Sequence, residues 1–95
     1  MIEITQNNGG KFGEFSANYD RENAGVLQYE WKNENTFNIV HTEVKDGFEG
    51  KGIGKHLVSA AVDFAREKGK KMEATCTFAH AVLAKDASVQ DIFSA

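Results

Sequence analysis

Alternating apolar and polar residues mark the first half of the chain as β-structure. The clearest run, residues 25–32, places Leu27, Tyr29 and Trp31 on one face and polar side chains on the other. A period of two residues is typical of a half-buried strand. Weaker alternation predicts three more strands, before a turn at 7–10, at 11–17 and at 36–45, with further turns at 20–23 and 33–35. Turns this short favour an antiparallel meander.

The fourth of these strands changes phase along its length. Phe37 and Ile39 share one parity, whereas Thr42 and Val44 share the other. Because side chains alternate strictly along a strand, the apolar side changes face only where an extra residue is inserted. The pattern therefore predicts a β-bulge near Val40-His41. A strand that is buried on both faces explains the pattern equally well.

The second half of the chain changes to helical spacing. Apolar residues recur every three to four positions over residues 53–68, and Gly69 follows as a stop signal, which predicts a helix. Alternation returns at 71–76, and Thr77 is a suitable N-cap for a short second helix. The predicted order is ββββαβα, an α/β (α+β) fold whose fourth and fifth strands are parallel. A C-terminal tail is expected to pack back through Val89, Ile92 and Phe93.

Composition narrows the classes of protein to consider. The 95 residues, 41% of them apolar, suffice for a single small domain, residues 1–95. A formal net charge of −3 argues against general nucleic-acid binding. The sequence shows neither a long apolar run nor a basic-then-apolar leader, so we expect no membrane span and no secretory signal. Cys76 is the lone cysteine, which favours a reducing, cytoplasmic setting.

Three glycines, at positions 50, 52 and 54, point to a binding function. They lie between a predicted strand and a predicted helix, where backbone N–H groups lack partners and the helix dipole is positive. Glycine lets such a backbone approach an anion closely, and Lys51 and Lys55 add positive charge. We interpret the segment as a phosphate-binding loop; the alternative is a flexible turn.

Two familiar phosphate-binding motifs do not fit this loop. A Walker loop requires Ser or Thr after its Gly-Lys pair, whereas His56 follows Gly54-Lys55 here. The dinucleotide-binding fingerprint G-x-G-x-x-G requires a third glycine where Lys55 or Leu57 stands. Both motifs are therefore excluded.

Residues 49–54, EGKGIG, resemble the acetyl-coenzyme A (acetyl-CoA) loop of the GNAT N-acetyltransferases, R/Q-x-x-G-x-G/A between the fourth strand and the next helix. Gly52 and Gly54 match its last two fixed positions, and Glu49 stands where the family has Arg or Gln. The resemblance extends over the whole chain and is close to the very small, single-domain GNAT-like proteins of the YjdJ type. Three segments carry it: NIVHTEV, GKGIGKHLVSAAVDFAREKG and ATCTFAHAVLAK.

This resemblance implies a minimal GNAT fold with acetyl-CoA or coenzyme A as its cofactor. The fourth and fifth strands are expected to splay apart, and the pantetheine arm to enter the gap between them. The segments that shape the acceptor site in larger members are largely missing. No metal site is expected. The cofactor-binding residues that the resemblance implies are Thr42, Val44, Glu49, Gly50, Lys51, Gly52, Ile53, Gly54 and Lys55, with Lys45 as a looser candidate.

Two residues are candidates for catalysis. Cys76 precedes a helix, whose N-terminus would make the thiol more acidic and more nucleophilic, and the resemblance places it near the reactive end of the coenzyme. His41 is the candidate general base, with Glu43 as a second, and a Cys-His pair would be an activated nucleophile. The alternatives are a buried, inert Cys76 and a His41 that serves only the bulge. His56 and His80 are expected at the surface, and Tyr29 and Trp31 in the core.

Two functions of different kinds follow from the resemblance. The first is transfer of an acetyl group to an amine or a protein lysine, either directly or through acetyl-Cys76. The second is a non-catalytic module that binds coenzyme A or acetyl-CoA and acts through a partner protein. A weaker third interpretation is a nucleotide- or anion-binding domain that uses the same loop. We expect the chain to be a monomer or a weak homodimer.

Overall fold

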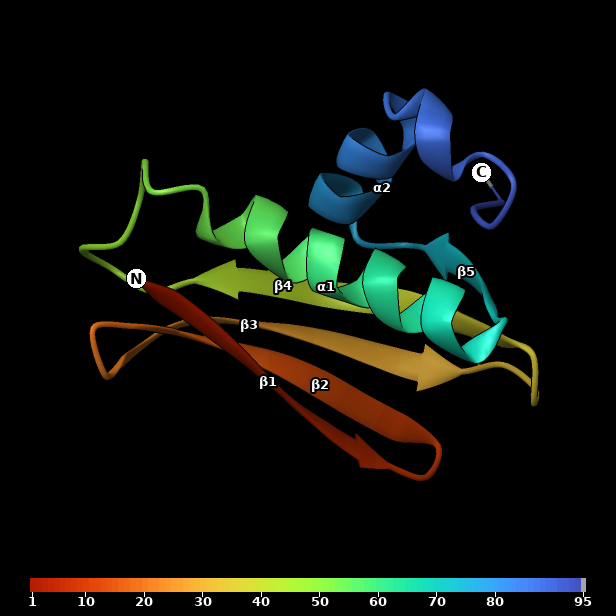
Figure 1. Ribbon diagram of the computed structural model, residues 1–95, viewed down its shortest axis with the longest axis horizontal. Helices are drawn as coiled ribbons and strands as arrows, with labels where there is room; N and C mark the ends of the chain where they lie inside the picture. The colour runs from red at the N-terminus through yellow and green to blue at the C-terminus, as the bar shows by residue number, and fades with distance from the viewer. Residues whose placement is uncertain (95) are drawn as a thin grey trace.

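The first four strands form the expected antiparallel meander, and the fifth adds to it in parallel (Figure 1). In the computed structural model, which describes residues 1–94, the sheet order is β1-β2-β3-β4-β5. The strands are β1 (Ile2–Gly9), β2 (Phe12–Tyr19), β3 (Glu22–Trp31), β4 (Thr36–Val44) and β5 (Lys71–Ala74). The helices are α1 (Ile53–Lys68) and α2 (Thr77–Ala84), followed by a short 3-10 turn, Ala87–Val89.

The helix α1 lies across one face of the sheet, and α2 packs beside it (Figure 1). The apolar stripe of α1 buries Leu57, Ala61 and Ala65. Opposite this stripe the sheet presents buried side chains that include Leu27 and Tyr29. The C-terminal segment completes the core, as predicted, because Val89, Ile92 and Phe93 are all buried. Among the described residues no helix is both long and apolar enough to cross a membrane.

A bulge in β4 changes which side chains face α1, as the phase change predicted. Gln28 of β3 pairs with His41, but its neighbour Tyr29 pairs with Ile39, so Val40 has no partner on β3. Before the bulge Ile39 is buried in the core, and after it Thr42 takes the place opposite the buried Leu27. The alternative of a strand buried on both faces is wrong, because Val40, His41 and Glu43 are exposed.

The bulge also marks the point where β4 and β5 separate. Their parallel pairing covers four register positions and ends at Ile39 and Ala74. Past this point the backbone N–H groups of Thr75 and Cys76 both donate to the Ile39 carbonyl oxygen, each at 3.1 Å. β4 then continues to Val44 without β5 beside it. The predicted splay between the fourth and fifth strands is therefore confirmed.

Two predicted turns are misplaced by a few residues. The turn expected at 7–10 lies later, because β1 runs to Gly9 and pairs with β2 along its whole length. The turn at 20–23 shortens to Asp20 and Arg21, which take positive φ angles of 48° and 75°. This is the backbone that a tight two-residue hairpin requires, and it lets β3 begin at Glu22. Backbone pairing across each hairpin therefore extends strands through polar residues that alternation alone assigns to turns.

The second helix begins differently from the prediction. β5 ends at Ala74 rather than at residue 76, and Cys76 is itself the N-cap of α2, with an extended backbone. Thr77, the predicted cap, is the first residue of the helix. Thr75 and Cys76 bond to β4 through their backbone N–H groups, and the chain leaves β5 two residues earlier than predicted.

Candidate active site

The loop before α1 presents an open helix N-terminus. Its N-cap is Gly52, whose φ of 74° lies in the left-handed region, and no side chain caps the helix. The first turn of α1 carries no acidic residue. The N–H groups at the start of a helix lack intrahelical partners and carry the positive end of the dipole, so this terminus is suited to an anion.

The glycines of the loop are required mainly by backbone conformation. Gly50 and Gly52 have φ angles of 79° and 74°, which side-chain-bearing residues rarely adopt. A Cβ at Gly50 would meet nothing within 4 Å, and one at Gly52 would meet only His56, at 3.8 Å. The surface above both residues is therefore open to a ligand.

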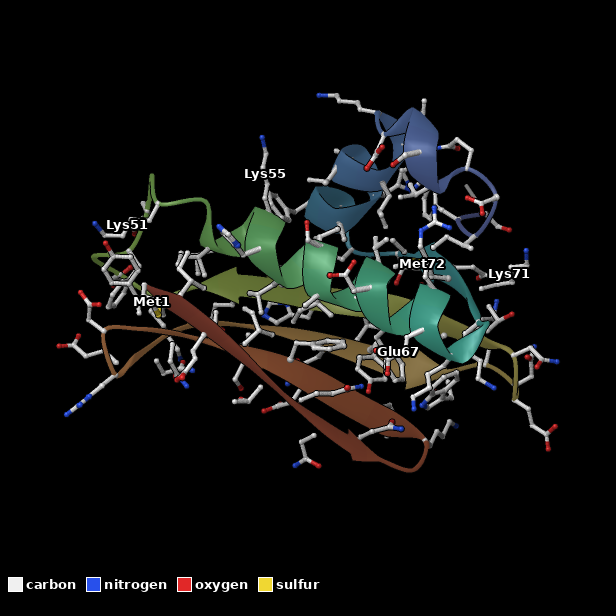
Figure 2. All side chains as sticks on the ribbon, in the orientation of Figure 1. Met1, Lys51, Lys55, Glu67, Lys71 and Met72 are labelled. Carbon is white, nitrogen blue, oxygen red and sulfur yellow. The ribbon has the colours of Figure 1, made fainter. Side chains whose placement is uncertain are left out.

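Charged side chains around the loop take different roles. The Glu49 carboxylate accepts a hydrogen bond from the backbone N–H of Gly47 at 3.0 Å, which holds the loop together. The Lys51 ammonium lies 5.0 Å from the centre of the Tyr19 ring, in a cation–π contact. Figure 2 shows Lys55 extending outward from the first turn of α1. The Lys45 ammonium instead lies 3.8 Å from the Glu43 carboxylate.

A groove runs between α1 and α2 next to this loop. Its volume is about 580 Å³, and its lining residues are Lys55, Phe78, Ala81, Val82, Lys85 and Asp86. Phe78 is 41% exposed. A Cβ on Gly54 would lie 2.7 Å from the Phe78 ring, so Gly54 is needed for the close packing of the two helix N-termini. The sequence carried no separate signal for this contact.

Cys76 lies between the splayed strand β4 and the start of α2. Its Sγ atom is 3.4 Å from the hydroxyl oxygen of Thr42, and the residue is half-buried. Burial raises the pKa of the Cys76 thiol, but hydrogen bonding by Thr42 and by first-turn amides of α2 outweighs burial and leaves the pKa below its usual value. Cys76 makes no side-chain capping hydrogen bond to α2. The thiol is therefore partly accessible rather than wholly buried.

His41 does not join Cys76. It pairs with Gln28 on the face of the sheet that α1 leaves uncovered, while Thr42, the partner of Cys76, lies on the α1 face. The exposed His41 Nε2 is 3.6 Å from the carboxylate of Glu43. The structure thus brings together Cys76 and Thr42 on one face, and His41 and Glu43 on the other. Thr42 was predicted only as a cofactor-binding residue, and the contact of its hydroxyl with Cys76 was not predicted.

The remaining histidines differ from each other. His56 is exposed, as expected. His80 is half-buried: its Nδ1 lies 3.4 Å from the Ala74 carbonyl oxygen, and its ring packs edge-on against Phe93 at 5.5 Å. The prediction of a surface His80 is therefore wrong, because the C-terminal segment folds over α2.

The Cys76 environment predicts an unusual pH dependence of thiol alkylation. We expect the iodoacetamide rate of the folded protein to rise with pH around a lower midpoint than that of the urea-unfolded chain. The reason is that hydrogen bonds to the thiolate lower the pKa of Cys76. Thr42→Val removes the hydroxyl and should raise the midpoint, whereas Thr36→Val, on the same strand but away from the thiol, should not. Equal midpoints for folded and unfolded protein would contradict this account.

The fold places the chain in a class of protein. An antiparallel meander with a bulged β4, a splayed parallel β4–β5 pair and an open N-terminus on the helix between them is the architecture of the acetyltransferases that use acetyl-CoA. Residues 14–92 match the family model described as GCN5-related N-acetyl-transferase. The chain belongs to this family.

Solved structures agree with the family assignment. A GCN5-like protein from Staphylococcus aureus is 34% identical, with a TM-score of 0.73, and the match covers 97% of this chain and 87% of that one. A GNAT family acetyltransferase from Elizabethkingia anophelis, solved with acetyl-CoA bound, has a TM-score of 0.65 over 75% of this chain and 62% of its own. At 19% identity this second likeness concerns the fold alone.

Curated relatives match a shorter stretch. Protein NATD1 of Xenopus tropicalis is 47% identical over 53 residues, which are 56% of this chain and 49% of NATD1. Protein NATD1 of Homo sapiens is 43% identical over a stretch of the same length. The chain thus matches about half the length of these relatives. The YjdJ type remains a prediction from the sequence.

Proposed function

We propose that the protein is an N-acetyltransferase that binds acetyl-CoA through residues 50–54 and transfers the acetyl group to an amine, either a small molecule or a protein lysine. One observation carries the proposal. The uncapped N-terminus of α1, the splay after Ile39 and the Cys76 thiol all lie along the same side of β4. A phosphate site and a reactive thiol are thereby joined by a gap between strands.

The residues around this gap suit the coenzyme. Backbone N–H groups in the first turn of α1, with Lys51 and Lys55, would hold the pyrophosphate, because Gly50 and Gly52 leave the approach open. Past the bulge, β4 has no β5 beside it, so the backbone at Thr42 and Val44 is available to amides of the pantetheine arm. Ile53 and Gly54 contribute N–H groups, whereas Glu49 supports the loop.

The chain offers its own nucleophile for the reaction. When bound, acetyl-CoA supplies an activated acetyl thioester. The Thr42 hydroxyl and the N-terminus of α2 favour the thiolate form of Cys76. An acetyl group on Sγ would pass to an amine as the new C–N bond forms and the C–Sγ bond breaks. The electron pair returns to Sγ, which these groups stabilise, and the amine proton goes to solvent.

Direct transfer is the other route within this proposal. There the amine itself attacks the thioester, and a base is needed only for its proton. His41 and Glu43 lie together on the uncovered face of the sheet, so they are the groups that the chain offers to an acceptor on that face. The non-catalytic module remains the second candidate, and it is favoured by the absence of a hydrogen bond between His41 and Cys76 among the described residues.

Replacing Cys76 separates these possibilities. The assay follows acetyl transfer from labelled acetyl-CoA to a lysine peptide and to spermidine, with coenzyme binding measured in parallel. If transfer runs through Cys76, Cys76→Ala should lower the rate at least a hundredfold while coenzyme binding persists. An unchanged rate would leave direct transfer, and His41→Ala should then lower it about tenfold or more. Coenzyme binding without transfer by the unmodified protein would establish the module instead and contradict the enzyme.

A further inference from the structure

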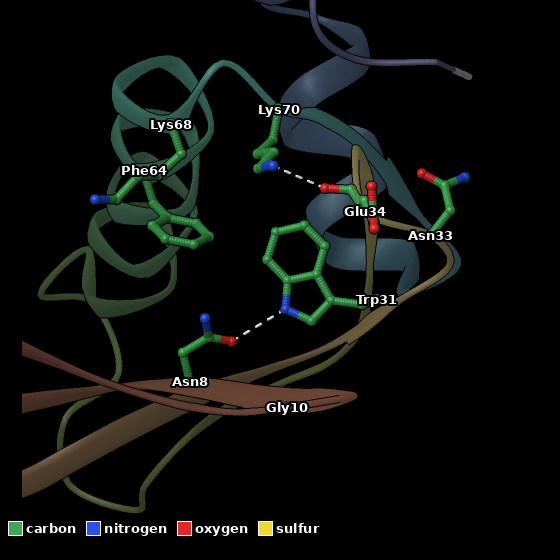
Figure 3. Close-up of a pocket in the computed structure, with 8 residues that line it drawn as sticks. All are labelled: Asn8, Gly10, Trp31, Asn33, Glu34, Phe64, Lys68 and Lys70. Carbon is green, nitrogen blue, oxygen red and sulfur yellow. Dashed lines mark hydrogen bonds between the residues drawn. The ribbon is translucent and has the colours of Figure 1, made fainter.

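A second cavity opens at the end of α1 far from the glycine loop. It has a volume of about 720 Å³, within the range of small-molecule sites. Asn8, Trp31, Phe64, Lys68 and Lys70 contribute to its lining (Figure 3). Phe64 and Lys68 belong to the last turns of α1, whereas Gly52 caps its first turn. A helix of 16 residues spans about 24 Å, so this cavity is separate from the candidate active site.

A hydrogen-bonded network fixes one wall of this cavity. The oxygen Oδ1 of Asn8 accepts two hydrogen bonds, from the Trp31 indole N–H at 3.0 Å and from the Tyr29 hydroxyl at 3.1 Å. The Tyr29 hydroxyl in turn accepts from Gln6 at 2.9 Å. Because the indole can only donate, the Asn8 amide has one possible orientation. Both the indole ring and the Asn8 side chain are therefore held in place before any ligand arrives.

This orientation leaves a donor aimed into the cavity. With Oδ1 engaged, the Asn8 Nδ2 group must point the other way, and Figure 3 shows it directed toward the space between the Phe64 and Trp31 side chains. Among residues 1–94, Nδ2 forms no side-chain hydrogen bond of its own. A fixed N–H₂ group beside two aromatic rings is suited to an acceptor oxygen of a ligand.

A lysine ammonium lies beside the aromatic wall of the cavity. The Lys70 ammonium donates to the Glu34 carbonyl oxygen at 2.8 Å and lies 5.9 Å from the centre of the Trp31 ring. Lys68 also lines the cavity, but its ammonium lies 3.9 Å from the Glu67 carboxylate. The cavity thus combines two aromatic side chains, a fixed amide donor and the Lys70 ammonium.

We propose that this cavity binds a planar aromatic carboxylate. The aromatic ring packs against Trp31 and Phe64, where a flat ring gains apolar contact and ring–ring interaction. The carboxylate accepts a hydrogen bond from Asn8 Nδ2 and a charge-assisted one from Lys70. None of the residues proposed to bind this ligand belongs to the glycine loop or to the gap between β4 and β5. The proposal therefore does not depend on the proposed acetyl transfer.

The test uses the sole tryptophan as a reporter. The chain has one Trp, so the indole N–H of Trp31 gives one resonance in an amide NMR spectrum. We would titrate the full chain with 2-naphthoate and with 2-naphthamide, which has the same ring and no charge. We expect the Trp31 indole resonance to shift with naphthoate, with a Kd of about 1 mM, as befits a ligand of that size. Resonances of Gly50–Gly54 should stay unchanged.

A substitution at Asn8 tests the donor itself. Asn8→Asp keeps an oxygen for Trp31 and Tyr29 but replaces the Nδ2 donor with a negative oxygen, so naphthoate should bind at least tenfold more weakly. Lys85→Gln, in the groove between α1 and α2, removes a charge elsewhere and should leave the affinity unchanged. The Asn8→Asp protein is first examined without ligand. If its Trp31 indole resonance is unshifted, the hydrogen bonds to Trp31 and Tyr29 are intact. Lys70→Gln leaves those hydrogen bonds untouched and should weaken naphthoate binding severalfold. It is therefore a second, independent test of the site.

Three results would overturn the proposal. One is an indole resonance that does not move at 10 mM naphthoate, a concentration about tenfold above the expected Kd. Another is naphthamide binding as tightly as naphthoate, which would leave a ring site without anion recognition. The third is Asn8→Asp and Lys70→Gln both binding naphthoate as the unmodified protein does.

Discussion

Replacing Gly52 with Asp should weaken acetyl-CoA binding strongly, whereas Gly52→Asn should retain much of the affinity. Asn and Asp are the side-chain-bearing residues that best tolerate the left-handed backbone, and Gly52 has a φ of 74°. A valine there would be strained, so it would report on folding as well as on binding. The two chosen variants have nearly the same shape, and only one places a negative charge at the start of α1.

The size of the difference follows from charge repulsion. Two like charges 4 Å apart cost about 1 kcal/mol in water and about 4 kcal/mol at an effective permittivity of 20. We therefore expect the Asp variant to bind about fivefold to a thousandfold more weakly than the Asn variant. The carboxylate also interacts favourably with the helix dipole, so the Asp variant should fold at least as stably.

Calorimetric titration with acetyl-CoA, accompanied by urea unfolding, measures both quantities. Equal weakening in the two variants would show that shape rather than charge controls the loop. Unchanged affinity in both would mean that the coenzyme does not contact the start of α1, and the proposed cofactor site would be wrong. Raising the salt concentration should narrow the gap between the variants, since exposed charges are screened.

The largest loss of stability is expected for Gly13→Ala. A Cβ on Gly13 would lie 2.3 Å from Cζ and 2.4 Å from the hydroxyl oxygen of Tyr29, which pairs with Gly13 across the sheet. Tyr29 is 0% exposed, and Gln6 and Asn8 hold its hydroxyl. Because the ring has no room to move, we expect a loss of about 1–3 kcal/mol in the free energy of unfolding, or somewhat more.

The same hairpin supplies the control. A Cβ on Gly9 would meet its nearest atom, the Phe12 carbonyl oxygen, at an acceptable 3.4 Å. Gly9→Ala should therefore change stability by less than about 0.5 kcal/mol. For a domain of this size, each kcal/mol lowers Tm by roughly 4–8 °C, so thermal and urea unfolding can both separate the variants. Similar stability of the two variants would contradict the packing described around Tyr29.

Local patterns in the sequence were sufficient for much of the fold. The period of two in residues 25–32 predicted β3, and the spacing after residue 53 predicted α1 with its stop at Gly69. The change of phase at Val40-His41 located the bulge, because a bulge is the one local event that reverses an alternating pattern. These features depend on residues that are near neighbours in the chain.

Features that depend on distant contacts were not predictable in the same way. Nothing local indicates that Thr42 contacts Cys76, 34 positions away, or that His41 faces the other side of the sheet. The sequence pattern fitted a β-bulge and a doubly buried strand equally well. Only the bulge places Thr42 on the face that α1 covers and His41 on the opposite face. The role of Gly54 likewise depends on Phe78, a residue of another helix.

The covered edge of β5 limits how copies of this chain can join through their sheets. The Met72 N–H donates to the Ile92 carbonyl oxygen, and the Ser94 N–H donates to that of Met72, so the C-terminal segment occupies the outer side of β5. Among residues 1–94, the opposite border of the sheet, β1, pairs with β2 alone. Apart from the short stretch of β4 past Ile39, β1 is the border that residues 1–94 leave free. Two copies that meet through β1 cover this border in both, so pairing through β1 ends at two copies.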